Sequence, residues 1–248
     1  MLFAIVASLI FIWGGGLLQP GSNAGTLIIV GILVGGILGT FGARKVAMTD
    51  MPQMVALLNG CGGGAAALIS TVEFANFAAG RGESDPLAFG ATLFGAVIGS
   101  LSFWGSLMAF GKLSGFMERA ITSAFQKFLT LAVFLALIAT IVWIGMGGGM
   151  VAFYTLLGIS LVFSLLMVIP IGGADMPVVI SLLNSCTGLA VAATGFALRE
   201  PALIISGTLV GASGTLLTLL MCKAMNRSIT NVLFAGVGSA PAATPGAA

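Results

Sequence analysis

Two asparagines, Asn59 and Asn184, occupy matching places in two copies of one motif. Each copy begins with Asp-Met-Pro and continues to Leu-Leu-Asn with the same spacing, at residues 50–59 and 175–184. Both copies lie within long apolar runs, so each asparagine is expected inside a membrane, where an unpaired polar group is costly. An amide donates and accepts hydrogen bonds but does not titrate. Such a side chain either orders water in a proton path or bonds to a neighbouring helix, and the residues alone leave both roles open.

Glu73 is a further candidate for a proton path. It lies 22 residues beyond Met51, which is about 33 Å of helix, so we expect it at the membrane interface opposite Met51. A carboxylate there is either the mouth of a channel or an ordinary interfacial charge. We expect no carboxylate, lysine or histidine at the centre of the bilayer. The sequence therefore predicts no catalytic residue and no self-contained proton pump.

The chain also lacks the pattern of a metal site or a disulfide framework. It has no histidine, and its three cysteines, Cys61, Cys186 and Cys222, all lie in apolar runs. An odd number of cysteines without metal-ligand spacing predicts small buried thiols and no metal. The net charge of +2 gives no reason to expect a nucleic-acid partner.

The elements that position these residues must be membrane helices. Only 6% of the 248 residues are charged and 58% are hydrophobic, which leaves too few charges to cover a water-soluble domain. A helix needs about 20 mostly apolar residues to span a bilayer. The predicted fold is an all-α integral membrane protein with about eight transmembrane helices, at Leu2–Leu18, Thr26–Gly42, Met51–Val72, Leu87–Phe110, Phe125–Met146, Met150–Ile169, Met176–Leu198 and Ala202–Met221.

Loop charges predict the orientation of these helices. In this topology seven of the nine basic residues lie on one side of the membrane, and basic loops favour the cytoplasmic side. Both termini are therefore predicted to be cytoplasmic. Both Asp-Met-Pro motifs follow an even-numbered helix, so they enter from that side as a parallel repeat of four plus four helices. The seven residues are Arg44, Lys45, Lys112, Arg119, Lys127, Lys223 and Arg227.

The repeat sets the predicted domain boundaries. The transmembrane domain is expected to cover residues 1–227, with repeat halves at about 1–112 and 125–227. Residues 228–248 comprise a short apolar stretch and a linker rich in proline, alanine and glycine, which has no fold of its own. We expect such a linker to lead to a further domain.

Charged residues near the helix ends have structural or functional interpretations. Asp50 and Asp175 precede a Met-Pro pair and are predicted as N-caps, where a carboxylate meets the positive end of the helix dipole. Lys223 and Arg227 lie one turn apart at the end of the last helix. There they either set the topology or form a docking surface for an anionic partner.

Glycines recur at helical spacing on several of the predicted spans. Gly207 and Gly211, with Gly214 nearby, follow this pattern in the last helix, as do Gly95 and Gly99 in the fourth. Small residues let helix backbones approach closely in a membrane. A smooth contact of this kind would also permit small sliding motions that transmit a conformational change.

Several longer stretches resemble one known family. They are GGADMPVVISLLNS at 172–185, GTLVGASG at 207–214, MCKAMNRS at 221–228, KVAMTDMPQMVALLNG at 45–60 and GSLMAFGKL at 105–113. Together they resemble the beta subunit of proton-translocating NAD(P) transhydrogenase, from about residue 44 to residue 238. The resemblance implies a multi-helix domain in the bacterial inner membrane that couples inward proton flow to hydride transfer from NADH to NADP⁺.

The resemblance also implies partners and cofactors. The membrane domain would form jointly with an alpha subunit, in a dimer of alpha–beta units. NAD(H) and NADP(H) would bind soluble domains, the NADP(H) domain following this segment in the same polypeptide, and no cofactor would bind the segment itself. It would therefore be part of an enzyme whose catalytic domains lie outside it.

The family also suggests roles for individual residues. It commonly carries a proton-transferring histidine at the position of Asn59, whereas this chain has asparagine there and no histidine anywhere. A titratable group would then lie on the partner subunit. Asn184 matches a functional asparagine of the family. Asp175, Lys223 and Arg227 match positions that couple the membrane domain to the NADP(H) domain, and Gly207, Gly211 and Gly214 match the glycine face of the last helix.

A different class of function also fits the residues. Parallel four-helix repeats with asparagines at membrane depth fit a secondary transporter for a small solute nearly as well, with two halves that rock against each other. A purely structural scaffold subunit is a third possibility. A nucleotide-binding domain in the reading frame beyond Ala248 would favour the transhydrogenase, and a stop codon would favour the transporter.

Overall fold

The computed structural model describes residues 24–81, 85–117, 125–172, 175–226 and 228–233, and all regular structure within these ranges is helical. The chain divides into two compact units, residues 1–49 and 50–248. The described part of the first unit contains α2 (Ala24–Lys45), an apolar helix that ends on two basic residues. The predicted helix Leu2–Leu18 lies outside the described residues.

The second unit contains the helices that carry most of the candidate site. In chain order they are α3 (Met51–Ala78), α4 (Pro86–Leu113), α5 (Gln126–Gly145), α6 (Gly149–Val168), α7 (Met176–Leu198), α8 (Pro201–Ala224) and the short α9 (Ile229–Leu233). A proline stands in the first turn of α3, α4, α7 and α8, where its missing N–H leaves no intrahelical bond unmade. With α2, seven described helices are long and apolar enough to cross a membrane, which confirms the all-α membrane class.

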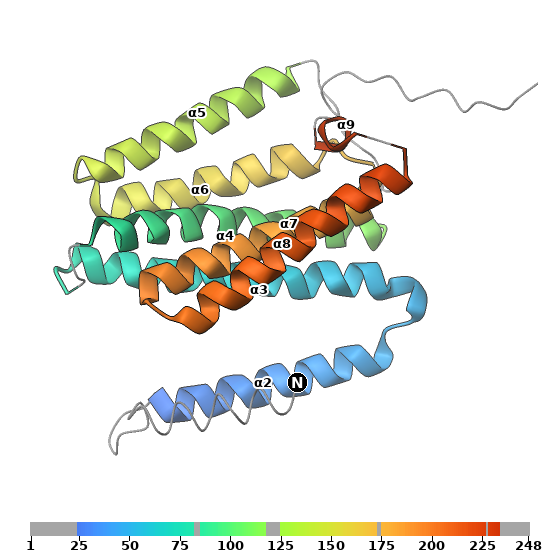
Figure 1. Ribbon diagram of the computed structural model, residues 1–248, viewed down its shortest axis with the longest axis horizontal. Helices are drawn as coiled ribbons and strands as arrows, with labels where there is room; N and C mark the ends of the chain where they lie inside the picture. Colours follow the sequence, from blue (N-terminus) through green and yellow to red (C-terminus); the bar gives the residue numbers. More distant parts are fainter. Residues whose placement is uncertain (1–23, 82–84, 118–124, 173–174, 227, 234–248) are drawn as a thin grey trace, which may run out of the picture. The chain divides into compact units, whose positions relative to one another are not determined.

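Within this unit α4 and α7 lie at the centre of the packing (Figure 1). Helix α4 packs against α3, α6 and α7, and α7 packs against α3, α4 and α8. Helix α5 packs mainly on α6 and leaves most of its surface exposed. Residues on α3, α4 and α7 therefore share one interior seam, which we call the three-helix seam.

The contacts along this seam show the direction of each helix. Early in α3, Gly62 lies beside Thr187 of α7, and farther along Gly95 of α4 faces both Ser70 of α3 and Thr194 of α7. Helices α3 and α7 therefore run parallel. Helix α4 runs antiparallel to both, because its Gly95 lies at Ser70 whereas its later Gly99 lies at the earlier Gly63 of α3. This confirms that the two Asp-Met-Pro motifs begin at the same end. We call it the Asp175 end, and the opposite end the Arg199 end.

Glycines bring neighbouring helices close at equivalent places in the two repeats. Gly63 of α3 and Gly188 of α7 each follow the methionine of their motif by 12 residues. A Cβ on Gly63 would lie 3.0 Å from the Gly99 carbonyl oxygen of α4, and one on Gly188 would lie 2.8 Å from the Gly207 oxygen of α8. Added side chains would clash with backbone here, so both helix pairs depend on glycine.

Apolar clusters fill the unit toward its two ends. At the Arg199 end, Phe74 of α3 stacks on Phe153 of α6 with their ring centroids 4.3 Å apart, and Leu93 and Leu156 pack around them. At the Asp175 end the first turn of α7 is buried against α3, α4 and α8. The space between these clusters contains the polar groups of the seam.

Several helices extend beyond their predicted ends. Helix α3 continues past the predicted Val72 to Ala78, and α4 continues past Phe110 to Leu113. Glu73 and Lys112 are therefore helical residues and not loop residues. The prediction ended these helices where polar residues began, although an interfacial helix tolerates polar residues in its last turns.

Candidate functional site

Asn59 lies at the centre of a buried polar cluster. Its side chain is 9% exposed on α3, and it faces two serines that stand one turn apart on α4. The amide Nδ2 donates to Ser106 Oγ at 2.9 Å and, with a longer contact, to Ser102 Oγ at 3.4 Å. Both amide hydrogens therefore have acceptors on the neighbouring helix.

The cluster continues onto α7 through Ser102. Ser102 Oγ donates to the Leu183 carbonyl oxygen at 2.9 Å and lies 2.5 Å from Thr187 Oγ1. Thr187 Oγ1 also donates to the Leu183 oxygen, at 3.1 Å. We call Asn59, Ser102, Ser106 and Thr187 the Asn59 cluster. It joins the three helices of the seam and includes residues from both repeats.

The chemistry of this cluster is limited to hydrogen bonding. A hydroxyl donates one hydrogen and accepts others, so a chain of hydroxyls can reverse its direction by rotation. None of the four side chains titrates near neutral pH. The cluster can therefore relay or order hydrogen bonds, but it cannot store a proton. The sequence left open whether Asn59 orders a proton path or bonds to a neighbouring helix. The hydrogen bonds of the cluster are compatible with both roles.

The structure does not bring Asn184 into the cluster. Asn184 lies half-buried on α7, one turn before Thr187, and its amide has no hydrogen-bond partner in the described part of the chain. The two asparagines of the repeat thus differ in surroundings. One is bonded within the seam, and the other remains available to water or to a neighbouring subunit.

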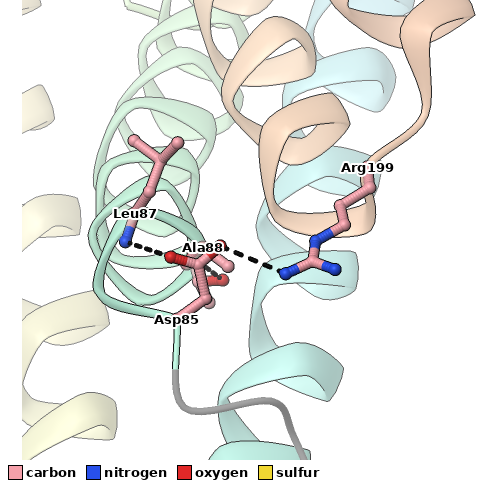
Figure 2. A network of polar contacts seen from close by, with 5 residues as sticks. Asp85, Leu87, Ala88 and Arg199 are labelled. Atoms are coloured by element: carbon pink, nitrogen blue, oxygen red, sulfur yellow. Dashed lines mark hydrogen bonds and ion pairs between the residues drawn. The ribbon is translucent and has the colours of Figure 1, made fainter.

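Glu73 lines a polar pocket at the Arg199 end. The pocket has a volume of about 320 Å³, and its other polar side chains are Asn76, Arg81 and Arg199. Arg199 pairs with Asp85 at 3.3 Å (Figure 2). Asp85 Oδ1 also accepts a hydrogen bond from the Leu87 N–H, and in this way the carboxylate caps α4. The pocket therefore lies where α3 and α7 end and α4 begins.

The backbone at Arg199 helps to shape this pocket. Arg199 follows α7 with a φ of 56°, the left-handed conformation that commonly ends a helix. Asp85 is the N-cap residue of α4, and its carboxylate pairs with the Arg199 guanidinium. The ion pair fixes the end of α7 against the start of α4 beside Glu73.

Residues at the Asp175 end fit the predictions less closely. Asp50 and Asp175 stand at the N-cap positions of α3 and α7, as predicted, but neither side chain makes a capping hydrogen bond. Asp175 is 6% exposed and Asp50 is exposed. Lys223 is exposed at the end of α8. Arg227 lies outside the described residues.

Lys112 is a polar residue whose role the sequence did not reveal. Its ammonium group lies at the end of α4 and donates to the carbonyl oxygens of Val168 at 3.1 Å and Ile171 at 2.7 Å, and also to that of Ile169. These carbonyls belong to the end of α6 and the turn that follows. The sequence predicts a loop position for Lys112, because positive charge beside a span normally marks topology, but the residue lies in the last turn of α4.

No metal site is present in the part of the chain that the structure describes, since no three histidine, cysteine or carboxylate side chains gather there. The three cysteines are separate thiols. Cys222 is buried, Cys186 is half-buried and Cys61 is exposed, so the prediction of a buried thiol is wrong for Cys61.

Comparison of the sequence with known proteins identifies the family of this chain. The family model described as NAD(P) transhydrogenase beta subunit matches residues 1–248. The chain is 41% identical, over 228 residues, to "NAD(P) transhydrogenase subunit beta" of Rhodospirillum rubrum and to the same subunit of one of its strains. The match covers 90% of this chain and 49% of each relative, so the chain spans about half their length. The chain therefore belongs to the NAD(P) transhydrogenase beta-subunit family.

Proposed function

We propose that this chain is the proton-translocating membrane part of an NAD(P) transhydrogenase. In this proposal inward proton flow drives hydride transfer from NADH to NADP⁺ in soluble domains. The observation that carries it is the Asn59 cluster, a buried hydrogen-bonded group that joins both repeats in a member of this family. Family membership also favours this function over the solute transporter that the repeats alone would allow.

The proposed proton path includes Asn59, Asn184 and Glu73. Glu73 lines a polar pocket at one membrane face, and Asn59 lies about 21 Å deeper along the same helix. Asn184 stands one turn from the Thr187 member of the cluster. Because none of the side chains of the Asn59 cluster titrates near neutral pH, we infer that the titratable carrier lies on a helix of the alpha subunit.

The proposed coupling to the nucleotide domain is at the Asp175 end. Asp175 precedes α7, Lys223 ends α8 and Arg227 follows it in the sequence. Between α7 and α8 the two backbones meet closely at Gly188, Gly207 and Gly211, and Ser185 donates across this contact to the Gly211 oxygen. A contact of this kind can slide by small steps, so a change around Asn184 can reach the end of α8.

The wider assembly follows from this proposal. The alpha subunit supplies further membrane helices and the NAD(H) domain, and the remainder of the beta subunit supplies the NADP(H) domain. The complex is a dimer of alpha–beta units in the bacterial cytoplasmic membrane, with both ends of this segment on the cytoplasmic side. The nucleotides bind in the soluble domains, and this segment itself binds none.

Proton uptake by proteoliposomes during NADPH-linked reverse transhydrogenation tests the proposal. The full-length beta subunit would be reconstituted with its alpha partner as wild type, Asn184→Leu and Thr208→Val. We expect the wild type to take up protons and Asn184→Leu to lose most of that uptake, because leucine cannot bind water. Thr208 is the matched control, since its exposed hydroxyl bonds to Ile204 of its own helix. Hydride transfer without proton uptake by the wild type would refute the function.

A further inference from the structure

The last turn of α4 belongs to the same uninterrupted helix as two members of the Asn59 cluster. Lys112 and Leu113 are the last two residues of α4, and Lys112 follows Ser106 by six residues. Six residues of helix are about 9 Å long. A shift of α4 at the Asn59 cluster would therefore also displace its last turn, at the Asp175 end.

On one side, the end of α4 is bonded to the first turn of α3. Gln53, which directly follows Asp-Met-Pro in the first motif, donates from Nε2 to the Leu113 carbonyl oxygen at 3.0 Å. Ser114 Oγ donates back to Gln53 Oε1, with a longer contact of 3.4 Å. The residue at the same place in the second motif is Val178, a buried apolar side chain. This pair of bonds is therefore a feature of the first repeat alone.

On the other side, the end of α4 is bonded to the turn that leads into the second motif. Lys112 Nζ donates to the Val168 oxygen at 3.1 Å and to the Ile171 oxygen at 2.7 Å, and also to the oxygen of Ile169. Ile171 lies beyond the end of α6, is 2% exposed and precedes Asp175 by four residues. Lys112 thus contacts the connecting turn as well as the end of α6.

Burial distinguishes Lys112 from a lysine that only marks topology. A long basic side chain near a helix end normally extends to water, whereas Lys112 is 9% exposed. A buried ammonium is costly unless acceptors surround it, and the three carbonyls supply these acceptors. The position of the turn before Asp175 is therefore set by the position of the Lys112 ammonium, and so by α4.

We infer that Gln53 and Lys112 are positioning residues for proton coupling, because they make the end of α4 a connector between the starts of the two Asp-Met-Pro motifs. A change in the Asn59 cluster reaches the start of α3 through Gln53 and the turn before Asp175 through Lys112. The inference rests on the proposed function, in which Asp175 couples to the nucleotide domain. It adds a route along α4 to the route along α8.

The chain offers a matched control for this test. Gln126 of α5 is 8% exposed, and its Nε2 donates at 2.9 Å to the Leu166 oxygen in the last turn of α6. Gln53→Met and Gln126→Met therefore remove the same kind of bond, from an amide to a carbonyl near a helix end. Helix α5 packs mainly on α6 and contains no member of the Asn59 cluster, so only Gln53 belongs to the connector.

The main readout is the ratio of protons taken up to hydride transferred. Full-length beta subunit with its alpha partner would be reconstituted in proteoliposomes as wild type, Gln53→Met, Lys112→Met and Gln126→Met, and assayed during NADPH-linked reverse transhydrogenation. We expect the ratio to fall severalfold in Gln53→Met and Lys112→Met and to match the wild type in Gln126→Met. Loss of folded complex lowers both quantities together, so a purely structural role would leave the ratio unchanged.

Hydrogen exchange tests the connector without reference to proton transport. Lys112→Met should speed exchange of the Ile171 and Gly172 amides, because their turn loses its contact with α4. Gln126→Met should leave these amides unchanged, since Leu166 lies within α6. Exchange in Lys112→Met at the wild-type rate would overturn the contact that the inference needs.

These outcomes separate the connector from the proposed function. A wild type that transfers hydride without taking up protons would refute the function, and the coupling role with it. A coupled wild type with wild-type ratios in Gln53→Met and Lys112→Met would overturn only the connector. An equal fall in Gln126→Met would also overturn it, because loss of any helix-end bond would then suffice. If Lys112→Met fails to assemble, the comparison of Gln53→Met with Gln126→Met decides.

Discussion

Lys112 shows how a single buried charge is accommodated in this chain. Its ammonium group donates to three carbonyl oxygens at and beyond the end of α6, where the helix leaves carbonyls without intrahelical partners. The positive charge also meets the negative end of the helix dipole. Lys112 thereby links α4 to the turn that leads into Asp175 and α7.

We expect Lys112→Met to destabilise the protein. Methionine fills a similar volume but leaves three carbonyls without their donor, and hydrogen bonds to a charged group contribute about 1.5–3 kcal/mol each. The thermal unfolding midpoint of the purified complex should therefore fall by several degrees. Lys223→Met is the matched control, because Lys223 is exposed at the end of α8. Equal midpoints for the two variants would contradict this role of Lys112.

The residues of the candidate site were only partly predictable. The repeated motif predicted that Asn59 and Asn184 lie at membrane depth, and Asn59 proves to be buried. Its partners Ser102 and Ser106 depend on the relative shift of α3 and α4, which a single sequence does not encode in any local pattern. Serine is also common in membrane helices, where it often bonds to its own helix, so these two serines gave no distinct signal.

At the scale of elements, glycine determines how the two repeats are built. Helix α3 meets α4 through Gly63, and α7 meets α8 through Gly188, at equivalent positions of the motif. Without a hydrophobic driving force between membrane helices, such close contacts supply much of the packing. The two helix pairs therefore share a close glycine contact between backbones as well as a sequence motif.

We expect Gly188→Val to disrupt the α7–α8 pair. Its Cβ would lie 2.8 Å from the Gly207 oxygen, and this contact is with backbone, which cannot rotate away. Overpacking of this kind costs about 1–3 kcal/mol or more, so assembly and thermal stability should fall together. Gly158→Val on α6 serves as the control, since a Cβ there meets nothing within 4 Å. A Gly188→Val complex as stable as this control would show that the helices are not held so closely.

Element positions were easier to predict than element ends. Apolar length and proline placement predicted all seven described spans, and for α7 they predicted both ends correctly, at Met176 and Leu198. The prediction was too short for α3 and α4 because it ended each span at the first charged or strongly polar residues. Those residues lie in the last turns, where a side chain reaches the interface or, like Lys112, a neighbouring helix.

At the scale of the second unit, the three-helix seam contains the Asn59 cluster, while α5 and α8 present large apolar surfaces. Phe128, Leu131 and Leu135 of α5 are each more than half exposed, as are Leu216 and Leu220 of α8. Surfaces of this kind suit lipid or the helices of a partner subunit. The Glu73 pocket lies at the Arg199 end of the seam, and the Asn59 cluster lies farther toward the Asp175 end.

Proton uptake by Asn59→Leu tests the central claim most directly. Full-length beta subunit with its alpha partner would be reconstituted in proteoliposomes, as wild type, Asn59→Leu and the exposed control Thr208→Val. We expect NADPH-linked proton uptake by the wild type and the control, and a severalfold loss in Asn59→Leu, because leucine cannot donate to Ser102 and Ser106. Uptake at the wild-type rate by an assembled Asn59→Leu complex would show that protons do not pass through this cluster.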